Sequence, residues 1–376
     1  MGSIRLGLAL VATLVAAAAF AGTSFAAVAN GHDSSHVVFV LTDNTSANQV
    51  VAYDRAANGA LSQAGVYSTG GKGGVLAGSV VDHTASQGAL AYDASRGLLF
   101  AVNAGSSTLS VFRVHGDRLT LTQVVSSGGT FPVSVAVRNG LVYVLNALNG
   151  GSVQGYLAFG DFLLPLPGSN RPLGLNPSAT PQFTTTPGQV AFSPDGSKLI
   201  VTTKANTNAI DVFFVGRLGY LSFSPVVNVE PGTVPFAVSF DGSGNLVVAE
   251  AGTNALATFG LAADGTVTPL HSVATGQAAT CWVAAAGPYF YASNAGSGSL
   301  SDIASGPGGA LSLLGTTSTD AGTVDAAATP DGSFLYVQTG AQGNVDAFRV
   351  NADGSLAAIG SVTVPGAVGG EGIVAL

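Results

Sequence analysis

Short runs of apolar and β-branched residues recur along the chain, and turns that contain glycine separate them. One kind of run ends in an apolar or aromatic residue and occurs seven times, with its last residue at Tyr53, Phe112, Tyr156, Phe213, Phe259, Ile303 and Phe348. Successive ends lie 44 to 59 residues apart, which is typical of four-stranded propeller blades. The pattern predicts an all-β fold, a seven-bladed β-propeller of four-stranded blades.

Each repeat contains the same four parts. In the third repeat, an apolar strand A at residues 135–137 meets an Asn139-Gly140 turn, and strand B follows at residues 141–144. Asn-Gly turns join antiparallel neighbours. Strand C then ends at the counted residue, and a turn with glycine leads into strand D.

The two ends of the propeller sequence complement each other. Residues 36–41 have the pattern of a strand B, so the first blade lacks its strand A. Residues 371–376 align with strand A of the third repeat, residues 132–137. We therefore expect the last strand to pair with the first blade and close the ring, which removes a free sheet edge.

The first residues have the layout of a secretory signal peptide. Arg5 precedes an apolar run over residues 6–20, and small residues end at Ala29. This layout predicts a signal peptide over residues 1–29, a single propeller domain over residues 30–376, and a secreted protein, extracellular or periplasmic. An uncleaved membrane anchor is the alternative, although the apolar run is short for a spanning helix.

The composition narrows the classes of partner. The chain carries 12 basic and 20 acidic residues, so nucleic acid and anionic membranes are not expected to bind after signal cleavage. Cys281 is the only cysteine, which rules out an internal disulfide. The five histidines show no metal-ligand spacing. We expect a monomer without metal or cofactor, and a small molecule as its ligand.

Two turn motifs carry a family resemblance. The motifs Ser193-Pro194-Asp195-Gly196 and Thr329-Pro330-Asp331-Gly332 each lead into an apolar strand. With the seven repeats, they resemble the lactonase propeller family, which includes bacterial 6-phosphogluconolactonases and fungal 3-carboxymuconate cyclases. The resemblance implies opening or closing of a lactone ring.

The family's histidine motif is not matched. In the family, a histidine-containing motif precedes the Phe-Ser-Pro-Asp-Gly turn and supplies part of the active site, but residues 187–192 contain no histidine. None stands at the equivalent positions of the other blades, which are Gly88, Val133, Phe236, Cys281, Val324 and Gly372. Catalysis must therefore be argued from other residues.

Two long insertions and a ring of polar residues are predicted to share one face. The insertions span about residues 72–86 and 168–186 and lie in connections from strand D to strand A. The residue after each strand B is polar, giving the set Asp43, Asn103, Asn146, Lys204, Glu250, Asn294 and Thr339. The set either caps the turns that follow or binds a ligand.

The predicted catalytic set is His83, Arg171, Lys204 and Glu250, with Asp82 beside the histidine. Such groups polarise a lactone carbonyl and activate water if they converge. Otherwise they are surface charges. Lys204 and Glu250 stand in consecutive blades and could form a salt bridge.

Cys281 and Trp282 begin strand A of the sixth blade. They are either core residues or a thiol nucleophile with an aromatic wall, although a catalytic cysteine normally needs a histidine partner.

Two functions follow. One is an exported lactonase-like enzyme for a small lactone or carboxylated ring compound at the channel mouth. The alternative is a non-catalytic propeller that binds a small molecule, glycan or protein through the insertion face.

Overall fold

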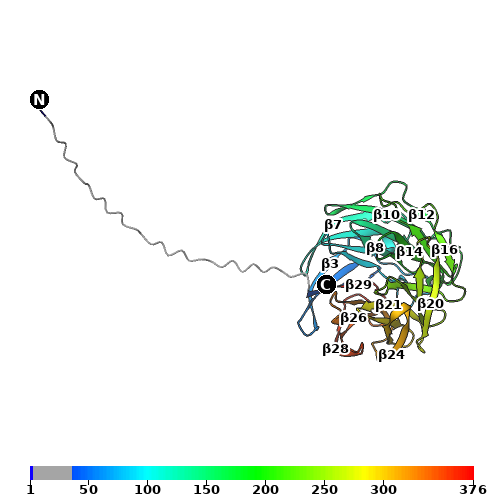
Figure 1. Cartoon of the computed structure of the whole chain (residues 1–376). Helices are drawn as coiled ribbons and strands as arrows, with labels where there is room; N and C mark the ends of the chain where they lie inside the picture. The colour runs from blue at the N-terminus through cyan, green and yellow to red at the C-terminus, as the bar shows by residue number, and fades with distance from the viewer. Residues whose placement is uncertain (3–35) are drawn as a thin grey trace. The chain divides into compact units, whose positions relative to one another are not determined.

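Seven antiparallel sheets form a ring of blades (Figure 1) in a computed structural model that describes residues 1–2 and 36–376. The predicted signal peptide, residues 1–29, falls outside the described residues except for its first two. The predicted seven-bladed propeller of four-stranded blades is confirmed. Among the described residues, no helix is long and apolar enough to cross a membrane.

The strands of each blade are given from the centre outward. The first blade has β29 (Ile373–Ala375), β1 (Val37–Leu41), β2 (Gln49–Arg55) and β3 (Leu61–Ser68). The second has β4 (Leu90–Asp93), β5 (Leu98–Asn103), β6 (Thr108–His115) and β7 (Arg118–Ser126). The third has β8 (Pro132–Arg138), β9 (Leu141–Asn146), β10 (Ser152–Phe159) and β11 (Phe162–Pro165), with β12 (Arg171–Pro172) also paired to β10. The fourth has β13 (Val190–Phe192), β14 (Lys198–Thr202), β15 (Ala209–Phe214) and β16 (Val226–Val229).

The fifth blade has β17 (Pro235–Phe240), β18 (Leu246–Glu250), β19 (Ala255–Leu261) and β20 (Val267–Ala274). The sixth has β21 (Thr280–Ala286), β22 (Tyr289–Asn294), β23 (Ser299–Ser305) and β24 (Leu311–Ser318). The seventh has β25 (Thr323–Ala328), β26 (Phe334–Thr339), β27 (Asn344–Val350) and β28 (Leu356–Thr363). Short helical turns are α1 (Gln182–Thr185), η2 (Ala104–Ser106) and η3 (Pro307–Gly309).

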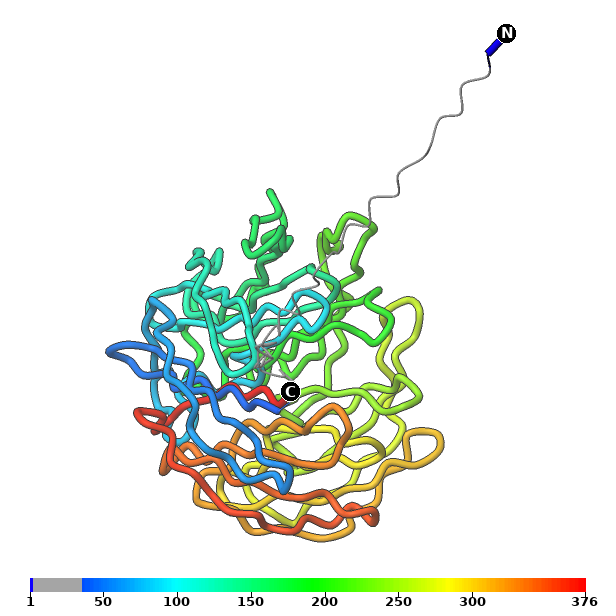
Figure 2. Tube along the Cα trace, turned by 90° about the vertical axis from the view of Figure 1, so that its left-hand side faces the viewer, coloured from blue at the N-terminus to red at the C-terminus, as the bar shows by residue number. Residues whose placement is uncertain are grey.

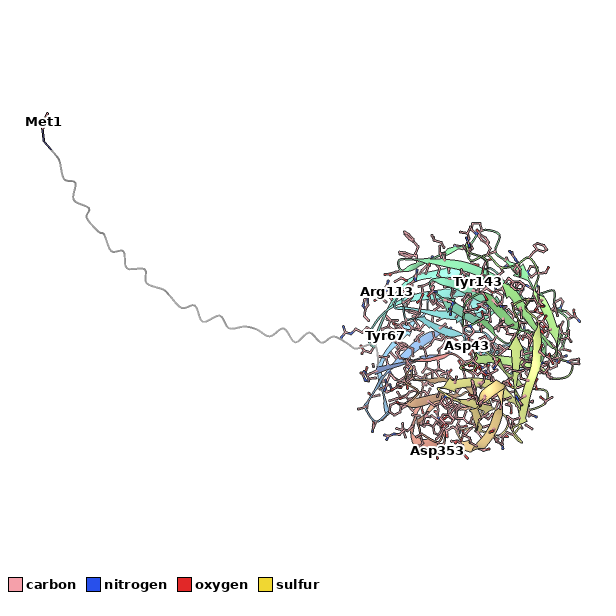
Figure 3. The ribbon with its side chains drawn as sticks, in the orientation of Figure 1. Met1, Asp43, Tyr67, Arg113, Tyr143 and Asp353 are labelled. Atoms are coloured by element: carbon pink, nitrogen blue, oxygen red, sulfur yellow. The ribbon has the colours of Figure 1, made fainter. Side chains whose placement is uncertain are left out.

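The second strand of a blade and its outermost strand differ in burial. Every residue of β1, β5 and β26 is buried, because a second strand is covered on both faces by neighbouring blades. The outer strands β3 and β24 are exposed at alternate residues or more. Side chains fill the spaces between blades, with Asp43 near the centre of the ring and Asp353 at its rim (Figure 3).

The C-terminal strand closes the ring as predicted. β29 pairs antiparallel with β1 through Val38–Ala375, Phe39–Val374 and Val40–Ile373. Two backbone hydrogen bonds extend the pairing, from Leu41 N to Gly372 O at 2.8 Å and from Leu376 N to Val37 O at 2.9 Å. Figure 2 shows the red C-terminal strand beside the blue first strands. The inner edge of β1 is therefore paired, and the first blade has four strands.

The Asn139-Gly140 turn adopts the conformation that its sequence predicts. Asn139 and Gly140 both have positive φ, 50° and 80°, as the first two-residue hairpin turn in the third blade requires. Asn and Gly tolerate this conformation, whereas a β-branched residue would be strained there. These short turns lie at the end of the blades opposite the two insertions.

Candidate functional site

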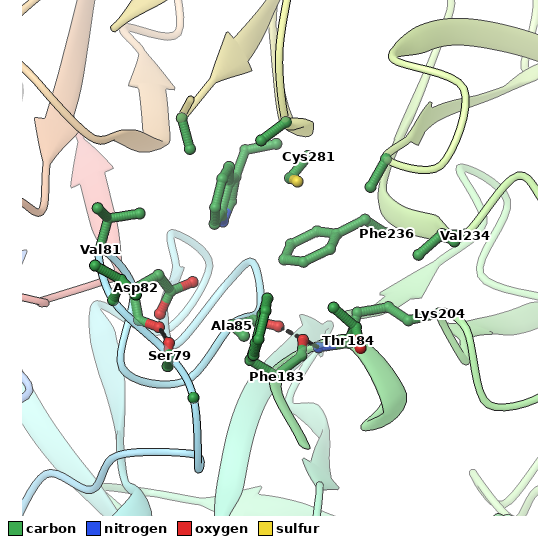
Figure 4. A pocket seen from close by; sticks show the side chains of 16 residues that line it. Ser79, Val81, Asp82, Ala85, Phe183, Thr184, Lys204, Val234, Phe236 and Cys281 are labelled. Atoms are coloured by element: carbon green, nitrogen blue, oxygen red, sulfur yellow. Dashed lines mark hydrogen bonds between the residues drawn. The ribbon is translucent and has the colours of Figure 1, made fainter. Parts of the chain in front are cut away.

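Both insertions line one pocket, which has a volume of about 170 Å³. The first insertion contributes residues 78–82 and Ala85, and the second contributes Phe183 and Thr184 near α1. The remaining wall comes from the fourth, fifth and sixth blades: Lys204, Val234, Phe236, Ala251, Ala279, Cys281, Trp282 and Ala295 (Figure 4). The lining is mostly apolar, with Asp82 and Lys204 as its charged residues.

Lys204 ties the two insertions together. Its Nζ donates to Ala85 O at 2.6 Å, to Phe183 O at 2.8 Å and to Thr186 Oγ1 at 3.2 Å. The ring centroid of Phe236 lies 5.1 Å from the same nitrogen. Burial lowers the pKa of Lys204 to about 7, although the Asp82 carboxylate opposes this shift. Lys204 is therefore positively charged below about pH 7 and loses its charge above it, and three protein acceptors already use its protons.

Asp82 stands across the pocket from Lys204 (Figure 4). Its Oδ1 accepts from Thr84 N at 2.8 Å and from Thr84 Oγ1 at 2.9 Å, and its Oδ2 accepts from Ser86 N at 2.9 Å. Burial raises the pKa of Asp82, while these hydrogen bonds lower it. The carboxylate is held in one orientation and is a stronger base than an exposed aspartate.

Phe236 and Trp282 form an aromatic wall. Their rings meet edge to face, with centroids 4.9 Å apart and an angle of 61° between planes. Trp282 Nε1 donates to Ser86 O at 2.6 Å, which fixes the indole against the first insertion. Phe236 lies within a register shift at the start of β17, and Trp282 directly follows one at the start of β21; such bulges redirect side chains.

Cys281 is a poor nucleophile in this setting. Burial raises the pKa of its thiol to about 12, although the Lys204 charge lowers it. A thiol with this pKa is almost entirely protonated at neutral pH. Cys281 therefore serves as a small apolar wall of the pocket.

Beside the first insertion, where Glu371 accepts from Thr84 Oγ1 at 3.4 Å, Asp325 and Glu371 form a buried carboxyl pair. They are 4% and 0% exposed and hydrogen-bonded to each other. Glu371 Oε1 accepts from Gly88 N at 2.7 Å. Burial raises the pKa of both carboxyls, Asp325 to about 7. The pair therefore retains a proton at pH values where exposed carboxyls have lost theirs.

Gln87 bridges the inner strands on opposite sides of the ring. Its Nε2 donates to Val283 O at 2.9 Å, and its Oε1 accepts from Val283 N at 2.9 Å. A second hollow, of about 330 Å³, is lined by Gln87, Val283 and small residues of β25 and β29. Gln87 thus lies in the wall of this second hollow.

The structure does not bring the four predicted catalytic residues together; only Lys204 lines the pocket. His83 Nδ1 lies 3.9 Å from Asp43 Oδ2, and its imidazole packs against Gly369. Glu250 accepts from Thr253 Oγ1 at 3.1 Å, and no ion pair links it to Lys204 among the described side chains.

Arg171 lies on β12, at the outer edge of the third blade. Its guanidinium donates to Ser222 O at 2.9 Å and to Leu221 O at 3.0 Å. Its hydrogen bonds to Gly168 O and Asn170 O complete the set. Arg171 therefore links the third blade to the fourth, because β12 pairs with β10 and the guanidinium binds carbonyls in the connection to β16.

The polar ring after the second strands is largely structural. Six of its members are 0% exposed and Glu250 is 7% exposed. Asn103 donates to Ser110 Oγ at 2.8 Å, and Asn294 accepts from Thr280 Oγ1 at 2.6 Å. These side chains satisfy backbone and hydroxyl groups at the turns, which is the capping role that the sequence left open.

Within the part of the chain that the structure describes, no group of three or more histidine, cysteine, aspartate or glutamate side chains is arranged to hold a metal ion. Asp325 and Glu371 are hydrogen-bonded to each other, and Asp82 accepts hydrogen bonds from Thr84 and Ser86.

Two residues that sequence reasoning did not assign to the site are Asp325 and Glu371. Glu371 lies two residues before β29 and aligns with the residues that begin four other inner strands, Pro132, Pro235, Thr280 and Thr323. An acidic residue at an inner-strand position was the signal that could have identified it.

Comparison with known proteins identifies solved structures that share this fold. No protein-family model matches the sequence, and no curated protein matches it. A Lactobacillus plantarum protein shares 20% identity at a TM-score of 0.71, over 90% of this chain and 98% of that one. The periplasmic gluconolactonase PpgL of Pseudomonas aeruginosa shares 18% identity at a TM-score of 0.67, over 90% and 98%.

A Bacteroides fragilis protein provisionally assigned as a 6-phosphogluconolactonase shares 19% identity at a TM-score of 0.68, over 89% of this chain and 97% of that one. These similarities confirm the predicted resemblance: the chain has the fold of lactonase-type propellers. At these identities the comparison establishes the fold, and an activity has to be argued from the pocket.

Proposed function

We propose that the chain is an exported lactonase-like enzyme that hydrolyses a small lactone or carboxylated ring compound in the pocket. The observation that carries the proposal is the placement of Asp82 and Lys204 across an aromatic, mostly apolar cavity. The volume of about 170 Å³ is below the range of drug-sized sites, which indicates a small ligand. The signal-peptide pattern of residues 1–29 supports export.

The chemistry needs a base and a positive charge. Asp82, with its raised pKa, accepts a proton from the water that attacks the lactone carbonyl. Lys204 lies on the other side of the pocket, where its charge stabilises the oxyanion that forms on the carbonyl oxygen. The ring carbon–oxygen bond then breaks, and the proton passes to the leaving oxygen to give a hydroxy acid. Phe236 and Trp282 contact the face of the substrate ring.

His83, Glu250 and Arg171 have no part in this proposal. His83 faces Asp43, Glu250 is hydrogen-bonded to Thr253, and Arg171 is held by backbone carbonyls at the outer edge. Only Lys204 is retained from the set predicted from the sequence.

The test is hydrolysis of a panel of five- and six-membered lactones. The proton released from the acid product is the quantity measured. We expect Asp82→Asn to lower kcat/KM by about 100-fold or more. The matched control is Asp43→Asn, a neighbouring buried carboxyl outside the pocket, which should change kcat/KM by less than about threefold. Equal losses in both variants, or binding of lactones without turnover by the unmodified protein, would show that the pocket is not a lactonase site.

A further inference from the structure

A patch of exposed apolar side chains lies on the hairpin formed by β10 and β11. Phe159 pairs with Phe162, and Leu157 pairs with Leu164, so all four side chains share one face. Their exposures are 72%, 51%, 45% and 52%. Ala158 and Leu163, on the other face, are buried. The hairpin therefore presents four large apolar side chains with no protein partner on that face.

The fourth blade extends this patch. Residues 215–225 connect β15 to β16, and an isolated β-bridge between Val215 and Leu221 closes a turn within them. Leu218 and Phe223 in this loop are 80% and 91% exposed. Figure 2 shows the chain near residues 160 and 218, in green shades, standing out along one edge.

A hollow of about 450 Å³ joins the two blades. Its lining includes Leu157 and Leu218, the two arginines Arg138 and Arg217, and one carboxylate, Asp195. Arg217 is exposed and makes no hydrogen bond or ion pair with another described residue. We call this surface the outer patch, consisting of Arg138, Leu157, Phe159, Phe162, Leu164, Arg217, Leu218 and Phe223.

Charge is distributed unevenly around the ring. Residues 90–229, the second to fourth blades, carry eight basic and five acidic side chains, whereas residues 230–376 carry one basic and eleven acidic. The net charge of −8 argues against binding of the whole protein to an anionic surface. The outer patch, however, lies in residues 90–229, where basic side chains outnumber acidic ones. An anionic surface would attract this half and repel the acidic one.

We propose that the outer patch docks the protein on an anionic lipid surface. Phe159, Phe162 and Phe223 enter the interface between headgroups and acyl chains, where aromatic and aliphatic side chains are stable. Arg138 and Arg217 contact lipid phosphates beside them. Apolar side chains at protruding loops suit a deformable lipid surface, because a rigid protein partner would need a matching cavity for each loop.

The experiment is flotation of the propeller from residue 30 onward, which contains every described strand, with two kinds of vesicle. We expect binding to phosphatidylcholine vesicles that contain phosphatidylglycerol and much weaker binding to phosphatidylcholine alone. Phe159→Ser with Phe162→Ser should lower the partition constant about tenfold or more. Arg138→Gln with Arg217→Gln should lower it to a similar degree, and only on vesicles with phosphatidylglycerol.

The matched control is Leu270→Ser with Leu313→Ser, which are 39% and 40% exposed on the outer strands of the fifth and sixth blades. This pair should leave binding unchanged. A Phe159→Trp variant gives a second readout: its fluorescence should shift to shorter wavelength on vesicle addition, while Trp282, the only native tryptophan, is buried.

Three results would overturn the proposal. The first is absence of binding to phosphatidylglycerol vesicles, and the second is an equal loss in the control pair. The third is self-association without lipid that the Phe159→Ser and Phe162→Ser changes abolish, which would identify a second copy of the chain as the occupant.

Discussion

Replacing Asp325 with asparagine should remove the part of the pH dependence of the ring's stability that Asp325 contributes. Asp325 and Glu371 are hydrogen-bonded to each other away from water. Burial raises the pKa of Asp325 from 3.8 to about 7 and also raises that of Glu371. Asparagine keeps the shape of the side chain and lacks the titrating proton.

The sign follows from the two states. The unfolded chain releases the proton near pH 3.8, whereas the folded chain keeps it up to about pH 7. Between these values the folded state binds more protons, so the free energy of unfolding falls as pH rises. A shift of about three pKa units corresponds to about 4 kcal/mol, most of which should be lost between about pH 5 and about pH 8.

Chemical unfolding at these two pH values measures the difference. The unmodified protein should lose about 3 kcal/mol more than Asp325→Asn on going from the lower to the higher pH. Asp264→Asn, an exposed control, should behave like the unmodified protein. If Asp325→Asn and the unmodified protein show the same pH dependence, the pair does not share a proton in the folded state.

Three further outcomes are expected. Lys204→Met removes three hydrogen bonds that hold the insertions and should lower the free energy of unfolding by about 2–4 kcal/mol. Equal stability of the variant and the unmodified protein at neutral pH would contradict a stabilising role for these hydrogen bonds. Deleting residues 371–376 removes β29 and should lower the melting temperature markedly, because β1 loses its inner partner; an unchanged melting temperature would show that another element closes the ring. Cys281, with a pKa of about 12, should react with iodoacetamide far more slowly than free cysteine at about pH 8, and reductant should not change the melting temperature; rapid alkylation or a large thermal shift would contradict this.

The fold was predictable because it depends on local and periodic signals. The repeating end residues from Tyr53 to Phe348 set the number of blades, and the Asn139-Gly140 turn set a hairpin. Ring closure followed from aligning the last residues with strand A of another repeat. Each of these signals is present in the sequence of one blade or in its comparison with the next.

The site was harder to predict, because its side chains come from insertions without a repeat. Asp82 and Lys204 were both noticed as polar positions, but only the path of the first insertion places them on opposite sides of one pocket. Arg171 was grouped with them because it lies in the second insertion. The pairing of β12 with β10 holds it at the outer edge instead, and no sequence pattern specifies that two-residue pairing.

The lactonase proposal is tested most directly by filling the pocket. Ala295→Phe places a ring in the cavity that Asp82, Lys204 and Trp282 line, while Ala57→Phe makes the same change at an exposed turn. The measurement is kcat/KM for the best lactone of the panel, with melting temperatures recorded beside it. We predict a loss of about 100-fold or more for Ala295→Phe and no loss for Ala57→Phe. Full lactonase activity in a folded Ala295→Phe protein would contradict the placement of the active site in this pocket.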